Sequence, residues 1–92
     1  MAVIFDPAKR LVTLEQRGLD FADAGKVFAG FHLTIEDDRI DYGETRYFTV
    51  GFLDERMVVL VWTPREDDQR IISMRKANDR EQKAYGPRLA GH

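Results

Sequence analysis

Residues 70–85 of this chain, RIISMRKANDREQKAY, decide its fold and hold its densest group of functional side chains. The first half alternates as a strand does, which predicts Arg70 and Lys76 on one face and Arg75 on the other. Asn78 is a residue type that caps helices, so a short helix is expected to follow it. Cationic side chains, a carboxylate and a phenol thus share one strand-to-helix unit. We expect this unit to hold the anion-binding site of the chain.

Length and composition limit the architecture to a small one. The 92 residues, 43% of them hydrophobic, predict one domain over 1–92 with a small core. Cysteine is absent from the sequence, which excludes disulfides and thiolate metal sites and suits a reducing compartment. The apolar run at 57–62 is far shorter than the roughly 20 residues of a membrane span, and the apolar start is too short for a signal peptide. We therefore expect a soluble cytoplasmic domain with no membrane partner.

Charge is distributed unevenly around a formal net charge of −2. Residues 1–64 hold seven Lys or Arg against eleven Asp or Glu, whereas residues 70–92 hold six against two. Such a chain can present one cationic face despite its net acidity. Solvated loops and a solvated helix would give the same counts, so charge alone leaves both interpretations open.

The first third of the chain predicts a strand and two helices. A short strand at 3–5 is followed by Asp6, which caps a helix that Gly18 ends. Asp20 is expected to cap a second helix, in which apolar residues recur at helical spacing until Gly30. This part of the chain therefore supplies helices to cover a sheet that the remainder builds.

The remainder of the chain is patterned as strands. Strands are expected at 32–35, 46–53, 57–63 and in the first half of 70–85, joined by tight turns. The continuously apolar strand 57–63 is expected at the centre of the sheet, and Trp62, Phe21 and Phe28 in the core. The predicted order is β-α-α-β-β-β-β-α. This is an α+β fold, a small antiparallel sheet packed with N-terminal helices and a C-terminal helix.

Three motifs are spread over most of the chain. They are FDPAK at 5–9, GETRYFTVG at 43–51, and RIISMRKA at 70–77 followed by Glu81 and Tyr85. Together they resemble the motifs of the BrnT toxins, and the likeness covers residues 3–85. The resemblance implies a ribonuclease toxin of a type II toxin–antitoxin system with a RelE-like fold. It further implies neutralisation by a BrnA-like antitoxin, whose dimerisation would give a heterotetramer and whose own DNA-binding part would repress the operon.

One position departs from that family and supports a second hypothesis. Arg17 stands where the family usually has a histidine. This departure and the net acidity favour a catalytically inactive BrnT-like module that only pairs with an antitoxin or regulatory protein. The intact segment 70–85 favours the active ribonuclease.

The implied reaction needs no metal or cofactor, because the ribose 2′-hydroxyl attacks the adjacent phosphate. The enzyme positions that hydroxyl, removes its proton, stabilises charge on the phosphoryl oxygens and protonates the leaving oxygen. Arginine suits the charge role, since its guanidinium stays cationic and binds two phosphate oxygens at once. Arg46, Arg70 and Arg75 are the candidates. Surface salt bridges to the acidic residues are their alternative role.

The proton-transfer groups are harder to assign from the sequence. Histidine is the usual choice near neutral pH, but His32 and His92 are isolated and are expected to be incidental. Glu81 and Lys76 remain as candidate bases, and Tyr85 as a proton donor or a stacking platform. Glu81 and Tyr85 are four residues apart and so share a helix face. Capping and packing of that helix is their alternative role.

Further cations are expected to bind RNA outside the catalytic group. They are Lys9, Arg17, Arg80 and Lys83, of which Lys9 is also a candidate base. Lys9 has the alternative of being a solvated helix residue. The acidic residues at 36–44 lack the alternating ligands and closing glutamate of an EF-hand, so a solvated loop is expected there.

Overall fold

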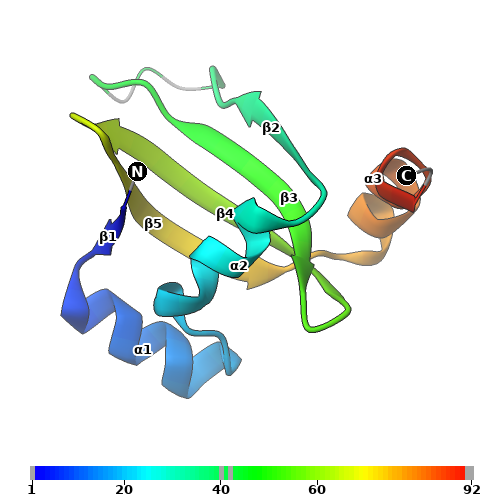
Figure 1. Cartoon of the computed structure of the whole chain (residues 1–92), viewed down its shortest axis with the longest axis horizontal. Helices are drawn as coiled ribbons and strands as arrows, with labels where there is room; N and C mark the ends of the chain where they lie inside the picture. Colours follow the sequence, from blue (N-terminus) through cyan, green and yellow to red (C-terminus); the bar gives the residue numbers. More distant parts are fainter. Residues whose placement is uncertain (1, 40, 42, 91–92) are drawn as a thin grey trace.

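The computed structural model describes residues 2–39, 41 and 43–90, which form a five-stranded sheet with helices on both faces (Figure 1). The N-terminal elements are β1 (Val3–Phe5), α1 (Pro7–Arg17), the 3-10 turn η1 (Phe21–Asp23) and α2 (Ala24–Ala29). The later elements are β2 (His32–Glu36), β3 (Tyr47–Leu53), β4 (Arg56–Arg65), β5 (Asp68–Lys76) and α3 (Asp79–Ala90). No helix in this described part of the chain is long and apolar enough to cross a membrane.

The sheet confirms the α+β class and the predicted order of elements, and it adds one parallel pair. The strand order is β1-β5-β4-β3-β2, so the apolar strand β4 lies at the centre as expected. β2 to β5 are antiparallel neighbours, whereas β1 runs parallel to β5, with Val3 opposite Gln69. The chain leaves β1 through α1 and α2 and enters the sheet at the far edge. β1 is therefore left to pair with β5 at the opposite edge.

Local signals place the helices much as the sequence predicts. The Asp6 carboxylate accepts a hydrogen bond from the Ala8 backbone N–H at 2.9 Å and so caps α1. Gly18 ends α1 at φ 69°, a left-handed conformation that glycine adopts without steric cost. Asp20 is also an N-cap, but it caps η1 and not α2, which begins only at Ala24. The predicted second helix is thus a 3-10 turn followed by a short α-helix.

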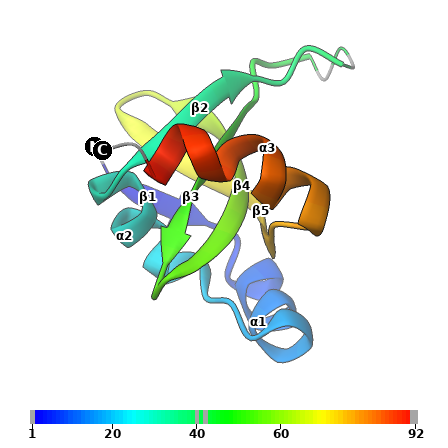
Figure 2. The same ribbon diagram turned by 90° about the vertical axis from the view of Figure 1, so that its right-hand side faces the viewer.

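The core has one cluster on each face of the sheet. On the face covered by η1 and α2, which we call the α2 face, Phe21 and Val27 pack with Leu60, Trp62 and neighbouring buried side chains. On the opposite face, the α3 face, Leu89 and Tyr85 of α3 pack with Val50 and Val59. Figure 2 shows α3 lying across the strands on this side of the sheet. The prediction of Trp62 and Phe21 as core residues is confirmed, and Phe28 is partly buried against the same cluster.

A β-bulge in β5 changes which residues share a face. Val61 is opposite Ser73 and Trp62 is opposite Ile71, so Ile72 is an extra residue on β5. The side-chain alternation shifts by one at that point, and strict alternation therefore predicted the wrong side for Arg70. Arg70 pairs with Thr63 and Arg75 with Val59, two β4 positions four residues apart and therefore on one face. Arg70 and Arg75 both lie on the α3 face.

Candidate functional site

A cavity of about 250 Å³ lies on the α3 face beside α3. Its apolar lining comes from β3 and β4, and its polar lining from the loop after β2, from β5 and from α3. We call it the α3 groove. The lining residues are Arg39, Phe48, Val59, Val61, Arg75, Glu81 and Tyr85. Three of the predicted catalytic residues, Arg75, Glu81 and Tyr85, thus line one cavity.

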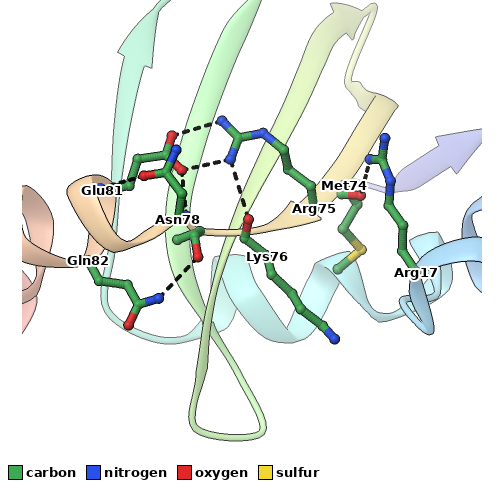
Figure 3. A network of polar contacts seen from close by, with 8 residues as sticks. Arg17, Met74, Arg75, Lys76, Asn78, Glu81 and Gln82 are labelled. Carbon is green, nitrogen blue, oxygen red and sulfur yellow. Dashed lines mark hydrogen bonds and ion pairs between the residues drawn. The ribbon is translucent and has the colours of Figure 1, made fainter.

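Arg75 is held in the α3 groove by a two-fold contact with Glu81 (Figure 3). Nη1 donates to Oε1 at 2.7 Å and Nη2 donates to Oε2 at 2.8 Å. The Arg75 side chain remains 43% exposed, so its guanidinium is oriented without being sequestered. Paired N–H groups on two carboxylate oxygens are the strongest geometry for such a contact, and the same fork matches a phosphate.

The sequence places Glu81 there by a local capping rule. The Asn78 side chain accepts from the Glu81 backbone N–H at 2.8 Å, and Glu81 Oε1 accepts from the Asn78 backbone N–H at 2.9 Å. This reciprocal pair is a capping box, with Asn78 as N-cap and Glu81 three residues later. Figure 3 shows both contacts at the start of α3. The same carboxylate therefore caps the helix and holds Arg75.

The electrostatics of the pair favour a positioning role for Glu81. Hydrogen bonds from Arg75, and then that of the Asn78 backbone N–H, hold the pKa of the Glu81 carboxyl below its usual range. The hydrogen bonds to Glu81 in turn raise the pKa of Arg75. A carboxylate with a lowered pKa stays ionised at neutral pH but accepts a proton weakly. Glu81 is suited to orient Arg75 more than to act as a general base.

Tyr85 contributes both packing and a polar group. It lies one helical turn after Glu81, lines the α3 groove and packs against the apolar cluster that contains Val59. An aromatic ring at the edge of an apolar cavity can stack on a base, and its hydroxyl can donate a hydrogen bond. The packing role foreseen as an alternative is therefore present, and Tyr85 still faces the groove.

Arg39 lines the α3 groove and was not singled out in the sequence. Its Nε and Nη2 donate to the two carboxylate oxygens of Asp37 at 2.8 and 2.9 Å. The Asp37 side chain is only 2% exposed, whereas that of Arg39 is 75% exposed. The expectation of a solvated acidic loop is wrong at Asp37, because its backbone N–H donates to the Arg46 carbonyl at 2.8 Å and fixes it beside the sheet. The Asp-x-Arg spacing was the only available signal.

Arg46 and Arg70 lie outside the α3 groove. Arg46 directly precedes β3, and its Nε lies 3.9 Å from Glu44 Oε2. Arg65 contacts the other Glu44 oxygen at 3.3 Å. The Thr63 hydroxyl, followed by Arg65, lowers the pKa of Glu44. The salt-bridge alternative for Arg46 is therefore present in the structure. Arg70 shares the α3 face with Arg75, but it pairs with Thr63, which lies four residues further along β4 than Val59, the partner of Arg75.

Lys76 and Arg17 line a different cavity. This second cavity, about 470 Å³, lies between the end of α1 and the β3–β4 hairpin, and Arg56 also lines it. Arg17 Nη1 donates to the Met74 carbonyl at 2.9 Å and so ties α1 to β5. Figure 3 shows the Lys76 side chain extending away from the guanidinium of Arg75. The structure does not bring Lys76 together with Arg75, although the two are adjacent in sequence.

The remaining predicted cations are exposed on helices. Lys9 lies on α1, whereas Arg80 and Lys83 lie on α3. Within residues 2–39, 41 and 43–90, no group of three or more His, Asp or Glu side chains converges as a metal site would.

The fold and the α3 groove define a class of small α+β protein with an arginine-lined surface suited to phosphate chemistry. A scan against protein-family models matches residues 5–81 to the ribonuclease toxin BrnT of type II toxin–antitoxin systems. The chain therefore belongs to the BrnT ribonuclease toxin family, which confirms the resemblance noted in its sequence. A search of curated proteins found no match to the chain.

Proposed function

We propose that this BrnT-family chain is a single-domain endoribonuclease that cleaves RNA without a metal, and that the α3 groove is its active site. The observation that carries the proposal is the Arg75 guanidinium, which is oriented by two hydrogen bonds that it donates to one carboxylate and is still exposed in a cavity. This arrangement supplies an oriented cation with a rigid support, which is what a phosphate group with developing negative charge requires.

In the proposed reaction the ribose 2′-oxygen bonds to the adjacent phosphorus while the bond from phosphorus to the 5′-oxygen breaks. The 2′-hydroxyl loses its proton to a base, and the leaving 5′-oxygen gains one. Arg75 binds the non-bridging oxygens, on which charge accumulates in the transition state. Glu81 keeps Arg75 in place, and Tyr85 stacks on a base or donates the proton to the leaving oxygen.

RNA outside the α3 groove would follow the cations on the same side of the molecule. Arg70 shares the α3 face with Arg75, Arg46 directly precedes β3, and Arg80 and Lys83 are exposed on α3. Phosphate contacts of this kind fix the register of the strand and make binding depend on salt. Lys9, Arg17 and Lys76 lie toward α1 and would contact only RNA that continues around the sheet.

The partner follows from the class of system to which the family belongs. We infer a cognate, BrnA-like antitoxin that binds the toxin and blocks RNA cleavage in the cytoplasm. Dimerisation of the antitoxin would give a heterotetramer, and its own DNA-binding part would contact the operator. The toxin would touch DNA only indirectly.

A second candidate function is an inactive module that only binds the antitoxin. It is supported by Arg17, which stands in place of a usual histidine and whose guanidinium is engaged by the Met74 carbonyl. A residue used to join α1 to β5 is less available for catalysis. The first proposal is preferred because the paired Arg75 and Glu81 lie in the α3 groove on the other face of the sheet.

An in vitro cleavage assay with single-stranded RNA and a chelator distinguishes the two functions. We expect the wild type to cleave RNA but not the same oligonucleotide with 2′-deoxyribose throughout. Arg75→Gln should lower kcat/KM by about 10²–10³-fold. Arg10→Gln is the matched control, because Arg10 makes the same kind of fork with Asp20 at 2.7 and 2.9 Å on α1. Intact RNA with folded wild-type protein would support the inactive module.

A further inference from the structure

We propose that Arg39 is a second phosphate-binding residue of the α3 groove, which takes a phosphate of single-stranded RNA next to the one bound by Arg75. Asp37 is its positioning residue. This inference rests on the proposed ribonuclease function and extends it to the way the substrate is held. It concerns a loop residue that lies outside the three sequence motifs of the chain.

Position is the first argument for Arg39. It lies 36 residues before Arg75 in the sequence, yet both line the same cavity. Arg75 enters from β5, and Arg39 enters from the loop that follows β2. Phe48, Val59 and Val61 supply the apolar lining. The groove therefore has one arginine on each of two separate segments, with apolar surface available for a base.

The support of Arg39 is the second argument. Its contact with Asp37 has the same two-fold form as the contact between Arg75 and Glu81. The carboxylate is buried and the arginine is exposed, with side-chain exposures of 2% and 75%. A buried carboxylate is fixed by its surroundings and so acts as an anchor, which directs the exposed guanidinium outward. An arginine whose only role was to neutralise Asp37 would not need to lie in the groove.

Electrostatics supply the third argument. The hydrogen bonds to Glu81 raise the pKa of Arg75, and the positive charge of Arg39 opposes that rise. The two guanidinium groups are thus close enough to repel each other. Repulsion between like charges costs free energy, and an anion placed beside both converts that cost into attraction. The phosphodiester backbone of RNA supplies such anions at regular intervals, which neutral or cationic ligands do not.

The apolar lining and Tyr85 select the form of the RNA. A single strand can turn its bases onto an aromatic ring and an apolar wall while its phosphates face the cations. A duplex keeps its bases stacked inside, so it cannot use these surfaces. We therefore assign the α3 groove to single-stranded RNA.

Salt dependence of binding tests the inference directly. The probe is a fluorescent single-stranded oligonucleotide with 2′-O-methyl groups, which the proposed chemistry cannot cleave. Each phosphate contact to a single strand contributes about 0.7 to the slope of log K against log salt concentration. Arg39→Gln should make the slope shallower by about 0.7. Arg39→Lys should restore the slope, because it keeps the charge, but should bind more weakly because it lacks the fork.

Matched variants separate this inference from the proposed function. Arg10→Gln removes an equally forked arginine from α1 and should leave the slope unchanged. A wild-type slope for Arg39→Gln, together with a reduced slope for Arg75→Gln, would overturn the role of Arg39 and leave the ribonuclease proposal intact. Failure of the wild type to bind or cleave RNA would overturn both. Circular dichroism verifies that each variant is folded.

Discussion

Arg75 on β5 and Glu81 on α3 are joined by two parallel hydrogen bonds of 2.7 and 2.8 Å, and the same carboxylate caps α3. Glu81 therefore links the strand that presents the cation to the helix that forms the groove wall. A change at Glu81 alters both the direction of Arg75 and the start of α3, whereas a change at Asn78 alters only the cap.

This linkage predicts different effects for the two capping-box residues. Asn78→Ala should lower the free energy of unfolding by about 1 kcal/mol and retain most RNA cleavage. Glu81→Gln keeps an oxygen for the Asn78 N–H but loses the charged fork, so kcat/KM should fall by about 100-fold. Denaturant unfolding and cleavage rates measure the two effects. Equal losses of activity in both variants would mean that Glu81 acts only through the helix cap.

The lowered pKa of Glu81 predicts a pH dependence of stability. Because Arg75 holds the pKa of Glu81 below its value in the unfolded chain, the folded state binds fewer protons than the unfolded state as the pH falls. The stabilisation is therefore complete above the ordinary glutamate pKa, roughly 4.3, and is lost progressively below it. Between about pH 5 and about pH 3, a range of roughly one unit on each side of that value, Glu81→Gln should lose less unfolding free energy than the wild type does. Identical acid profiles would contradict the prediction.

Close packing of α2 on β3 predicts opposite effects for two glycines. A Cβ on Gly51 would lie 2.7 Å from Cγ1 of the fully buried Val27, so Gly51→Ala should destabilise the fold by about 1–3 kcal/mol. Gly25, within α2, has open space at that position, and Gly25→Ala should stabilise by up to about 1 kcal/mol. Thermal unfolding compares the two variants. A neutral Gly51→Ala would show that α2 can move away from β3.

A buried hydrogen-bond chain on the α2 face gives a fourth prediction. Trp62 Nε1 donates to Thr49 Oγ1 at 2.8 Å, and this hydroxyl lies 2.8 Å from that of Thr34. Thr49→Val would leave the indole N–H without its acceptor and should cost about 1–3 kcal/mol of stability. Thr34→Val is the control, because Thr34 is exposed and the acceptor of Trp62 survives. Equal unfolding free energies for the two variants would argue against the chain.

Local sequence signals were sufficient for most of the fold. Caps such as Asp6 and Asn78, glycine at the end of α1 and the apolar strand β4 each act over a few residues, so their effect is visible in the sequence. The same is true of Arg75 and Glu81, which are six residues apart. The strand at 3–5 was predicted, but its parallel pairing with β5 was not, because that pairing joins residues more than sixty positions apart.

The rest of the candidate site depends on contacts between distant segments. The bulge at Ile72 depends on the register in which β5 pairs with β4, and it places Arg70 on the same face of the sheet as Arg75. Arg39 reaches the groove because Asp37 is fixed by the backbone of Arg46. Lys76 is separated from Arg75 by the alternation of β5, which the sequence did predict. The charges of Arg70, Arg75 and Lys76 and their proximity along the chain suggest a single cluster. The sheet instead places Lys76 on the face opposite Arg70 and Arg75.

The pairing of β1 with β5 also bears on how the protein is made. β1 is the first of the described strands to be synthesised, and its partner in the sheet is the last. β5 and α3 form the walls of the α3 groove, and they leave the ribosome after β3 and β4, which line its floor. Domains fold as their segments become available during translation. A nascent chain of this toxin therefore has no complete α3 groove until most of the chain has been translated. The edge of the sheet at which β1 pairs with β5 is completed at the same stage.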